Sequence, residues 1–127
     1  MPHRSIKQFR DDRAAAQARV LETQHLGIKR FFSLDSSTYK DSTDKGGLDA
    51  GTKHLLGMAV SMALRCNDCV DYHLEGCVQE GVDEKHIEEA FNIAMLIGGS
   101  IVIPHLRHAR LSLDELLEER AQQQRGS

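Results

Sequence analysis

The sequence predicts an all-α fold, a single-domain helical bundle that forms oligomers. The 127 residues include only two prolines and no tryptophan, and 40% of them are hydrophobic, which suits one compact domain. Apolar residues recur at spacings of three and four along most of the chain, as they do on one face of a helix. Gly81, a common helix stop, and Asp83, a good N-cap, separate two such stretches.

Residues 1–47 are expected to hold a first helix followed by a polar loop. The helix runs from about residue 5 to residue 24, because the apolar spacing and an alanine run favour helix, and Gly27 ends it. Residues 28–34 add a short turn. Residues 33–47 are polar and rich in turn formers, so we expect an ordered loop, either a functional lid or a plain connector.

Residues 48–121 are expected to form the helical core. A first core helix begins near Asp49 and has so little polar surface that it should be buried. A second begins at Asn67 or Asp68 and ends before Gly81. We expect its inner face to carry Cys69, Val70, His73, Leu74, Cys77 and Val78, and its outer face to carry Asp71, Glu75, Gln79 and Glu80.

Two further helices complete the predicted core. Asp83 caps the third, which the Gly98-Gly99 pair ends. The last begins near Ser100 and continues with apolar residues at helical spacing. Residues 122–127 form a polar tail that we expect to fray.

Charge and composition exclude several classes of function. The net charge of −3 provides no basic surface for nucleic acid or for an anionic membrane. The charged N-terminus lacks the apolar segment of a secretory signal, and the longest apolar run, residues 93–104, is too short to span a bilayer. Three cysteines do not suit a secreted disulfide scaffold. We therefore expect a cytoplasmic protein, in which a close cysteine pair is more often catalytic or metal-binding than structural.

The most informative motif is Cys66-Asn67-Asp68-Cys69, followed four residues later by His73. A helix advances about 100° per residue, so Cys69 and His73 lie within roughly 60° of Cys66 on one helix face. Two thiols at this spacing can close into a disulfide and reopen. An imidazole one turn beyond the second thiol can hold or remove its proton. The pattern indicates a redox-active dithiol with its own base.

The start of a helix favours the thiolate, which is the nucleophilic form of cysteine. Asn67 or Asp68 is expected to cap this helix, which places Cys69 in the first turn beneath His73. We expect Cys69 to attack and Cys66 to resolve the oxidised product as a disulfide. The opposite order, in which Cys66 attacks first, stays open.

A zinc site is the main alternative for these residues. Cys66, Cys69, His73 and Cys77 share one helix face. Cys66 and Cys77 are nevertheless about 16 Å apart along a helix, whereas the ligands of one zinc ion lie about 2.0–2.3 Å from it. We therefore expect no metal within one chain, and a metal shared between subunits stays open. Cys77 is interpreted mainly as a small core residue.

The segment TKHLLGMAVSMALRCNDCVDYHLEGCVQEGV resembles the carboxymuconolactone decarboxylase-like superfamily, in its alkylhydroperoxidase D-like branch. The shared features are a buried helix that ends in CxxC, the histidine four residues on, and a further amphipathic helix, over roughly residues 48–109. The resemblance implies an all-α fold assembled into trimers or hexamers. It also implies reduction of hydroperoxides by the CxxC pair, which a partner protein with a dithiol re-reduces, without a bound cofactor.

One position departs from the family pattern. Redox members usually carry a glutamate twelve residues before the first cysteine, in a proton relay to the thiols, and this chain has His54 there. A histidine also carries protons near neutral pH, but its protonated form stabilises a thiolate whereas a carboxylate opposes it. His54 therefore replaces the relay, shifts its pH optimum, marks a branch with weak peroxidase activity, or is a surface histidine without a role.

The leading hypothesis is thus an enzyme that reduces small hydroperoxides or exchanges disulfides through Cys66 and Cys69, assisted by His73 and His54. His105 is a weaker candidate for the substrate pocket. A second hypothesis is a decarboxylase or isomerase of a small organic acid that uses His54 and His73 as acid and base. A third is a non-enzymatic oligomer that senses redox state. In each case apolar stripes on the first and last helices favour a homo-oligomer, a trimer or hexamer by the resemblance.

Overall fold

The computed structural model describes residues 3–126, which contain six α-helices, two short 3-10 helices and no strand. The predicted all-α fold is confirmed. Residues 1, 2 and 127, at the ends of the predicted segments 1–47 and 122–127, lie outside the described residues. The helices are α1 (Ile6–Val20), α2 (Leu26–Thr38), η1 (Thr43–Lys45), α3 (Ala50–Ala63), α4 (Asn67–Gln79), α5 (Glu84–Gly98), η2 (Ser100–Val102) and α6 (Ile103–Arg125).

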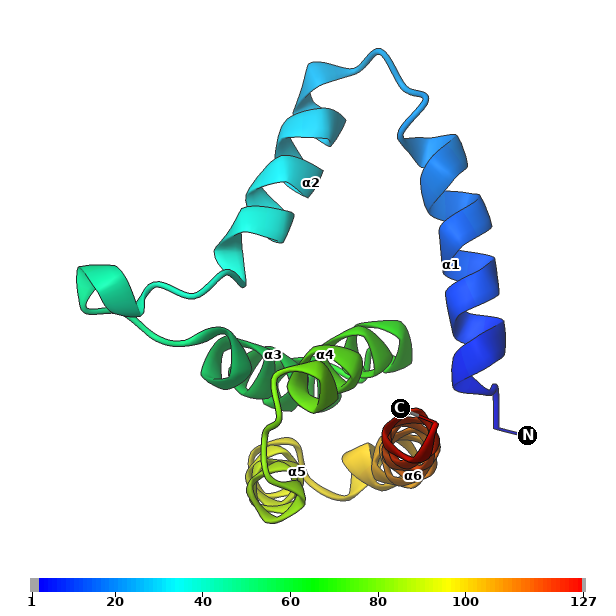
Figure 1. Cartoon of the computed structure of the whole chain (residues 1–127), viewed down its shortest axis with the longest axis vertical. Coiled ribbons are helices and arrows are strands. Elements are labelled where there is room, and N and C mark those ends of the chain that lie inside the picture. The colour runs from blue at the N-terminus through cyan, green and yellow to red at the C-terminus, as the bar shows by residue number, and fades with distance from the viewer. Residues whose placement is uncertain (1–2, 127) are drawn as a thin grey trace.

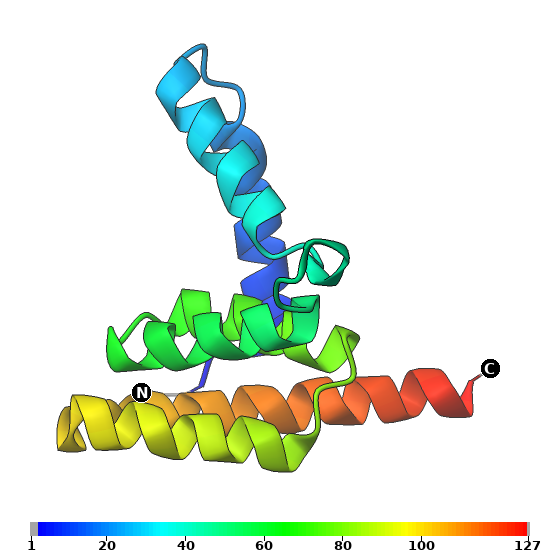
Figure 2. The same ribbon diagram turned by 90° about the vertical axis from the view of Figure 1, so that its left-hand side faces the viewer.

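Four helices, α3 to α6, form the body of the molecule (Figure 1). Helices α3 and α4 make one layer, and α5 and the long α6 lie beside it as a second layer (Figure 2). Side chains from all four helices meet in one core. Four of them, one from each helix, have no exposed surface: Met58, Leu74, Ile87 and Leu113. The predicted core helices are confirmed, and Asp83 caps α5 by accepting from the N–H of Lys85 at 2.7 Å.

The first turns of α1 fasten this helix to the body. Ile6 and Phe9 are buried. Arg10 donates to Glu75 of α4 at 2.8 Å and to Glu119 of α6 at 2.6 and 2.8 Å. Beyond this point α1 leaves the body, and α2 returns toward it at an angle (Figure 1).

The prediction for residues 21–38 was wrong. Helix α1 ends at Val20, and residues 26–38 form α2, where we expected a turn and the start of a loop. The helix begins because the ring of His25 caps it, accepting from the N–H of Ile28 at 3.3 Å, so Gly27 lies in its first turn rather than ending α1. No residue of α2 is buried, and Phe31 is 64% exposed.

Helix α6 is 23 residues long and continues to Arg125, into the segment predicted to fray. That fraying stays a prediction. None of the helices within residues 3–126 is long and apolar enough to cross a membrane.

Candidate active site

Cys66 and Cys69 form a disulfide at the start of α4, with their Cα atoms 5.3 Å apart. Cys66 itself is the N-cap of α4, and its Sγ accepts from the N–H of Cys69 at 3.2 Å. The prediction that Asn67 or Asp68 caps the helix was therefore wrong. The chain reaches this cap through Arg65, the one non-glycine residue between 3 and 126 with a positive φ, at 64°. The sulfur of Cys66 thus faces the positive end of the helix.

The two sulfur-bearing residues differ in their access to solvent. Cys69 is exposed, so the prediction that it lies on the inner face of the helix was wrong, and Cys66 is half-buried. Cys69 and His73 line one cleft of about 540 Å³ between α1, α2 and the start of α4. Apolar side chains contributed by the two N-terminal helices, Phe9, Val20 and Phe31, line the same cleft. Cys69 is therefore the cysteine that a small molecule in this cleft would reach.

His73 contacts His54 of α3 directly. Their Nδ1 atoms lie 3.1 Å apart, so one ring donates and the other accepts. His73 is only 6% exposed, and burial, assisted by the nearby His54, lowers its pKa from 6.5 to about 4. Burial also lowers the pKa of His54. Both rings are therefore neutral at neutral pH, and the pair can accept a proton.

Glycines make the space for the two rings. A Cβ on Gly57 of α3 would lie 2.7 Å from the His73 ring, and a Cβ on Gly76 of α4 would lie 2.5 Å from the His54 ring. Each helix thus presents a histidine and, three residues later, the glycine that receives the ring of the other helix. The sequence contains this pattern as His54-Leu-Leu-Gly57 and His73-Leu-Glu-Gly76, and neither glycine was predicted to belong to the site.

Two tyrosines enclose the histidine pair, and neither was predicted. Tyr39, at the C-cap of α2, stacks on His54 with ring centroids 5.1 Å apart and lies 4.7 Å from the ring of His73. Tyr72 meets His73 edge-on at 5.1 Å and lines the cleft of Cys69. Helix α2, which packs little elsewhere, is therefore joined to the site through Tyr39.

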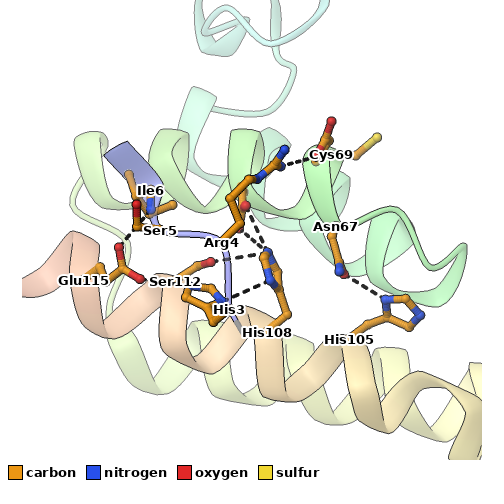
Figure 3. A network of polar contacts seen from close by, with 12 residues as sticks. His3, Arg4, Ser5, Ile6, Asn67, Cys69, His105, His108, Ser112 and Glu115 are labelled. Atoms are coloured by element: carbon orange, nitrogen blue, oxygen red, sulfur yellow. Dashed lines mark hydrogen bonds and ion pairs between the residues drawn. The ribbon is translucent and has the colours of Figure 1, made fainter. Parts of the chain in front are cut away.

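A second polar network lies on the α6 side of α4 (Figure 3). Asp71, predicted to face outward, has no exposed surface and accepts from His108 Nε2 at 2.9 and 3.0 Å. His108 contacts His3 at 3.1 Å between their Nδ1 atoms, and His3 Nε2 lies 2.8 Å from Glu115. The prediction was wrong because α6 packs over this face of α4 and supplies a partner for the carboxylate.

Two other predicted residues lie apart from the cleft. His105 Nδ1 is 2.8 Å from the side-chain oxygen of Asn67, and His105 does not line the cleft of Cys69. Its pocket role stays a prediction. Cys77 is buried and not disulfide-bonded, and burial raises its pKa to about 12, so it is a core thiol. Between residues 3 and 126, no group of three or more His, Cys, Asp or Glu side chains is arranged to hold a metal ion.

Residues 29–110 match the carboxymuconolactone decarboxylase family. The chain belongs to the carboxymuconolactone decarboxylase family. A relative from Paracoccus denitrificans, an uncharacterized protein of the cox locus, is 30% identical over 104 residues, which cover 80% of this chain and 90% of the relative. The family assignment confirms the superfamily inferred from the CxxC segment, and the alkylhydroperoxidase D-like branch stays a prediction.

Solved structures of the carboxymuconolactone decarboxylase family share this fold. A protein from Thermotoga maritima has 46% identity and a TM-score of 0.84 over 91% of this chain and 98% of its own. A second crystal structure of the Thermotoga maritima protein has 45% identity and a TM-score of 0.83, over 91% of this chain and 94% of its own. An involvement in the antioxidative response has been suggested for that protein. A family protein from Legionella pneumophila, with 22% identity, a TM-score of 0.77 and coverage of 87% and 96%, shows the fold alone.

Proposed function

We propose that this protein is a thiol-dependent oxidoreductase that reduces small hydroperoxides, or exchanges disulfides, through Cys66 and Cys69. One observation carries the proposal. The Cys66–Cys69 disulfide lies at the start of α4, and its exposed member opens into the cleft that His73 also lines. The antioxidative role suggested for the Thermotoga maritima relative supports the same chemistry.

In the first step the Cys69 thiolate attacks the terminal oxygen of the hydroperoxide. The O–O bond breaks, Cys69 becomes a sulfenic acid, and the leaving alkoxide takes a proton to become an alcohol. We assign the attack to Cys69 because it is exposed in the cleft, whereas Cys66 is half-buried. His73 is neutral, so it accepts the thiol proton and can return it to the alkoxide.

In the second step Cys66 attacks the sulfenic sulfur of Cys69. The S–O bond breaks, water leaves, and the disulfide seen in the structure forms. The helix start favours the thiolate of Cys66, because its sulfur already accepts an N–H of α4. An external protein dithiol then reduces the disulfide and is itself oxidised, which returns both thiols without a bound cofactor.

His54 extends the proton path away from the thiols. Its Nδ1 bonds to His73, and its ring also borders a separate cavity of about 210 Å³ that Tyr72 and Glu75 line as well. A proton on His73 can therefore pass to His54 and leave by that cavity. In this proposal two neutral histidines replace the glutamate-containing relay of redox relatives, and His54 does not act as a cation beside the thiolate.

We further propose that the working unit is a cytoplasmic homo-oligomer, a trimer or hexamer. Helix α2 supports this proposal, because it buries no residue within its own chain and exposes Leu26, Phe31 and Leu34. An apolar helix face of this kind is normally covered in a stable protein.

The test is a thiol count on the reduced protein, followed in time after one equivalent of an organic hydroperoxide. We expect rapid loss of two thiols per chain, restored by a dithiol reductant. Cys69→Ser should abolish turnover, whereas Cys66→Ser should retain the first attack and stop at a sulfenic acid that dimedone traps. Fast trapping at Cys66 in the Cys69→Ser variant would instead reverse the order of attack.

The histidine pair also keeps a second function open, general acid–base chemistry on a small organic acid. The direct contact between His54 and His73, both neutral, favours it. A Cys66→Ser/Cys69→Ser double variant separates the two functions. Decarboxylation or isomerisation that survives in the double variant would support acid–base catalysis and remove the dithiol from the mechanism.

A further inference from the structure

Both residues between the two cysteines are held by side chains from distant parts of the chain. Asn67 is held by His105 of α6, as described above. Asp68 forms an ion pair with the guanidinium of Arg4, from the segment that precedes α1. Figure 3 shows Arg4 reaching over α4 toward Cys69, and His105 approaching Asn67 from the other side. The CxxC segment is therefore fixed from both sides.

The position of Arg4 is itself fixed by the neighbouring residues. His3 lies against His108 and Glu115, which anchors the residue just before Arg4 to α6. The Arg4 guanidinium lies over the ring of the buried Phe9, 5.2 Å from its centroid. Arg4 thus stands at a defined place on the rim of the cleft, which it lines together with Cys69.

Arg4 is one of two arginines that line the cleft of Cys69. A carboxylate next to a thiol opposes its ionisation, and a guanidinium favours it. Charged residues that line the cleft are Arg4, Arg13, Asp12, Asp35 and Asp68. Arg65 precedes the dithiol, His73 is neutral, and His105 faces Asn67. Without Arg4, the charged side chains that line the cleft would be one arginine and three aspartates, so negative charge would predominate.

We propose that Arg4 is a positioning residue of the dithiol, whose guanidinium offsets the Asp68 carboxylate and so favours the thiolate of Cys69. The inference rests on the proposed function, because the thiolate is the attacking species there. The side chains of Arg4 and Asp68 are 35% and 69% exposed, and exposed ion pairs contribute little to folding. Removing the pair therefore changes the thiol chemistry with little effect on the fold.

The experiment measures alkylation of the reduced protein by iodoacetamide across a series of pH values, with the modification at Cys66 and at Cys69 distinguished by fragmentation of their shared peptide in the mass spectrometer. Arg4→Gln should raise the midpoint of the Cys69 profile by about half a pH unit, since a unit charge nearby acts through solvent. Asp68→Asn should lower it by a similar amount. The double variant should return close to the parent protein.

Two further variants separate charge from structure. Arg4→Lys keeps the charge and should keep the midpoint near that of the parent protein. Arg19→Gln removes the same charge from α1, where Arg19 pairs with Glu22 on the surface, and should leave the midpoint unchanged. In glutathione redox buffers, Arg4→Gln should also make the reduction potential of the disulfide more negative, because the reduced form loses stabilisation.

An unchanged midpoint in Arg4→Gln, or a double variant that stays far from the parent, would overturn the proposal. If Arg4→Gln does not fold, Asp68→Asn decides, and a midpoint that does not fall contradicts the role of this pair. Hydroperoxide is absent from these measurements. Shifted midpoints in a protein that ignores hydroperoxide would therefore contradict the proposed function alone, and peroxidase turnover with unshifted midpoints would contradict the role of Arg4 alone.

Discussion

The Nδ1 atoms of His54 and His73 lie 3.1 Å apart across the interface of α3 and α4. Because burial holds the pKa of His73 near 4, this ring stays a proton acceptor well below the pH at which an ordinary histidine is charged. We expect hydroperoxide reduction to keep its neutral base down to about pH 4. The rate constant of the first step is measured by stopped flow and divided, at each pH, by the fraction of Cys69 that is thiolate. This corrected rate constant should show no acid limb near pH 6.5.

Replacing His54 by Gln tests the coupling between the two rings. The charge of His54 is the smaller of the two causes that lower the pKa of His73, after burial. We therefore expect His54→Gln to move the acid limb upward and to slow the first step roughly tenfold or more, as loss of a proton relay does. His86→Gln removes an exposed histidine of α5 and is the matched control. An unchanged rate and profile in His54→Gln would exclude the relay.

Folding stability should depend on pH through the same buried ring. The pKa of His73 is lowered on folding, so the unfolded chain binds more protons between about pH 6.5 and pH 4. The contribution of His73 is complete above pH 6.5 and is lost as the pH falls through 4. Urea denaturation of the protein and of His73→Gln should diverge across this window, with the parent protein losing more stability. Parallel curves would contradict burial of a neutral ring.

The glycines that receive the rings should not accept a methyl group. In Gly76→Ala the new Cβ would lie 2.5 Å from the His54 ring, and in Gly57→Ala it would lie 2.7 Å from the His73 ring. Overpacking costs about 1–3 kcal/mol, which outweighs the helix preference of alanine over glycine, about 1 kcal/mol at most. We expect lower stability and a displaced histidine, measured by urea denaturation and histidine NMR shifts.

Gly126→Ala is the control for this pair, because its Cβ would have no neighbour closer than 3.4 Å. It should leave stability and histidine shifts unchanged. Stabilisation of the protein by Gly76→Ala would show that the ring does not occupy this space.

Asp71 should be among the residues most important for stability. It has no exposed surface, and both of its carboxylate oxygens accept from His108. Removing one partner of a buried hydrogen bond leaves the other group unsatisfied, which costs roughly 1–3 kcal/mol. We expect Asp71→Ala to lose stability in this range by urea denaturation. Asp11→Ala, which removes an exposed carboxylate that pairs with Lys7, should change stability far less.

The sequence predicts those helices that bury an apolar face. It does not predict a helix whose apolar face stays exposed. Apolar spacing located α3 to α6, because their faces meet in one core. Helix α2 was missed because none of its residues is buried in the part of the chain that the structure describes, and its cap is a histidine rather than one of the usual capping residues. Gly27 was therefore predicted to end α1, although it lies in the first turn of α2.

Local spacing likewise found Cys66, Cys69 and His73, which share one helix. It could not find Arg4, whose partner Asp68 is 64 residues away, or Tyr39, which reaches the histidine pair from another helix. Asp71 was assigned to the wrong face because the prediction treated α4 as half-exposed, whereas α6 covers that side. Contacts between distant elements leave no local pattern, so these residues emerge only from the folded chain.

The pairing of each histidine with a glycine on the opposite helix has an evolutionary consequence. His54 needs Gly76, and His73 needs Gly57, so the four positions form two couples that should change together. Where the position of His54 carries a smaller side chain, selection no longer requires glycine opposite it. Across the family, we therefore expect glycine at position 76 wherever position 54 carries a ring, and covariation between the two positions would show this coupling.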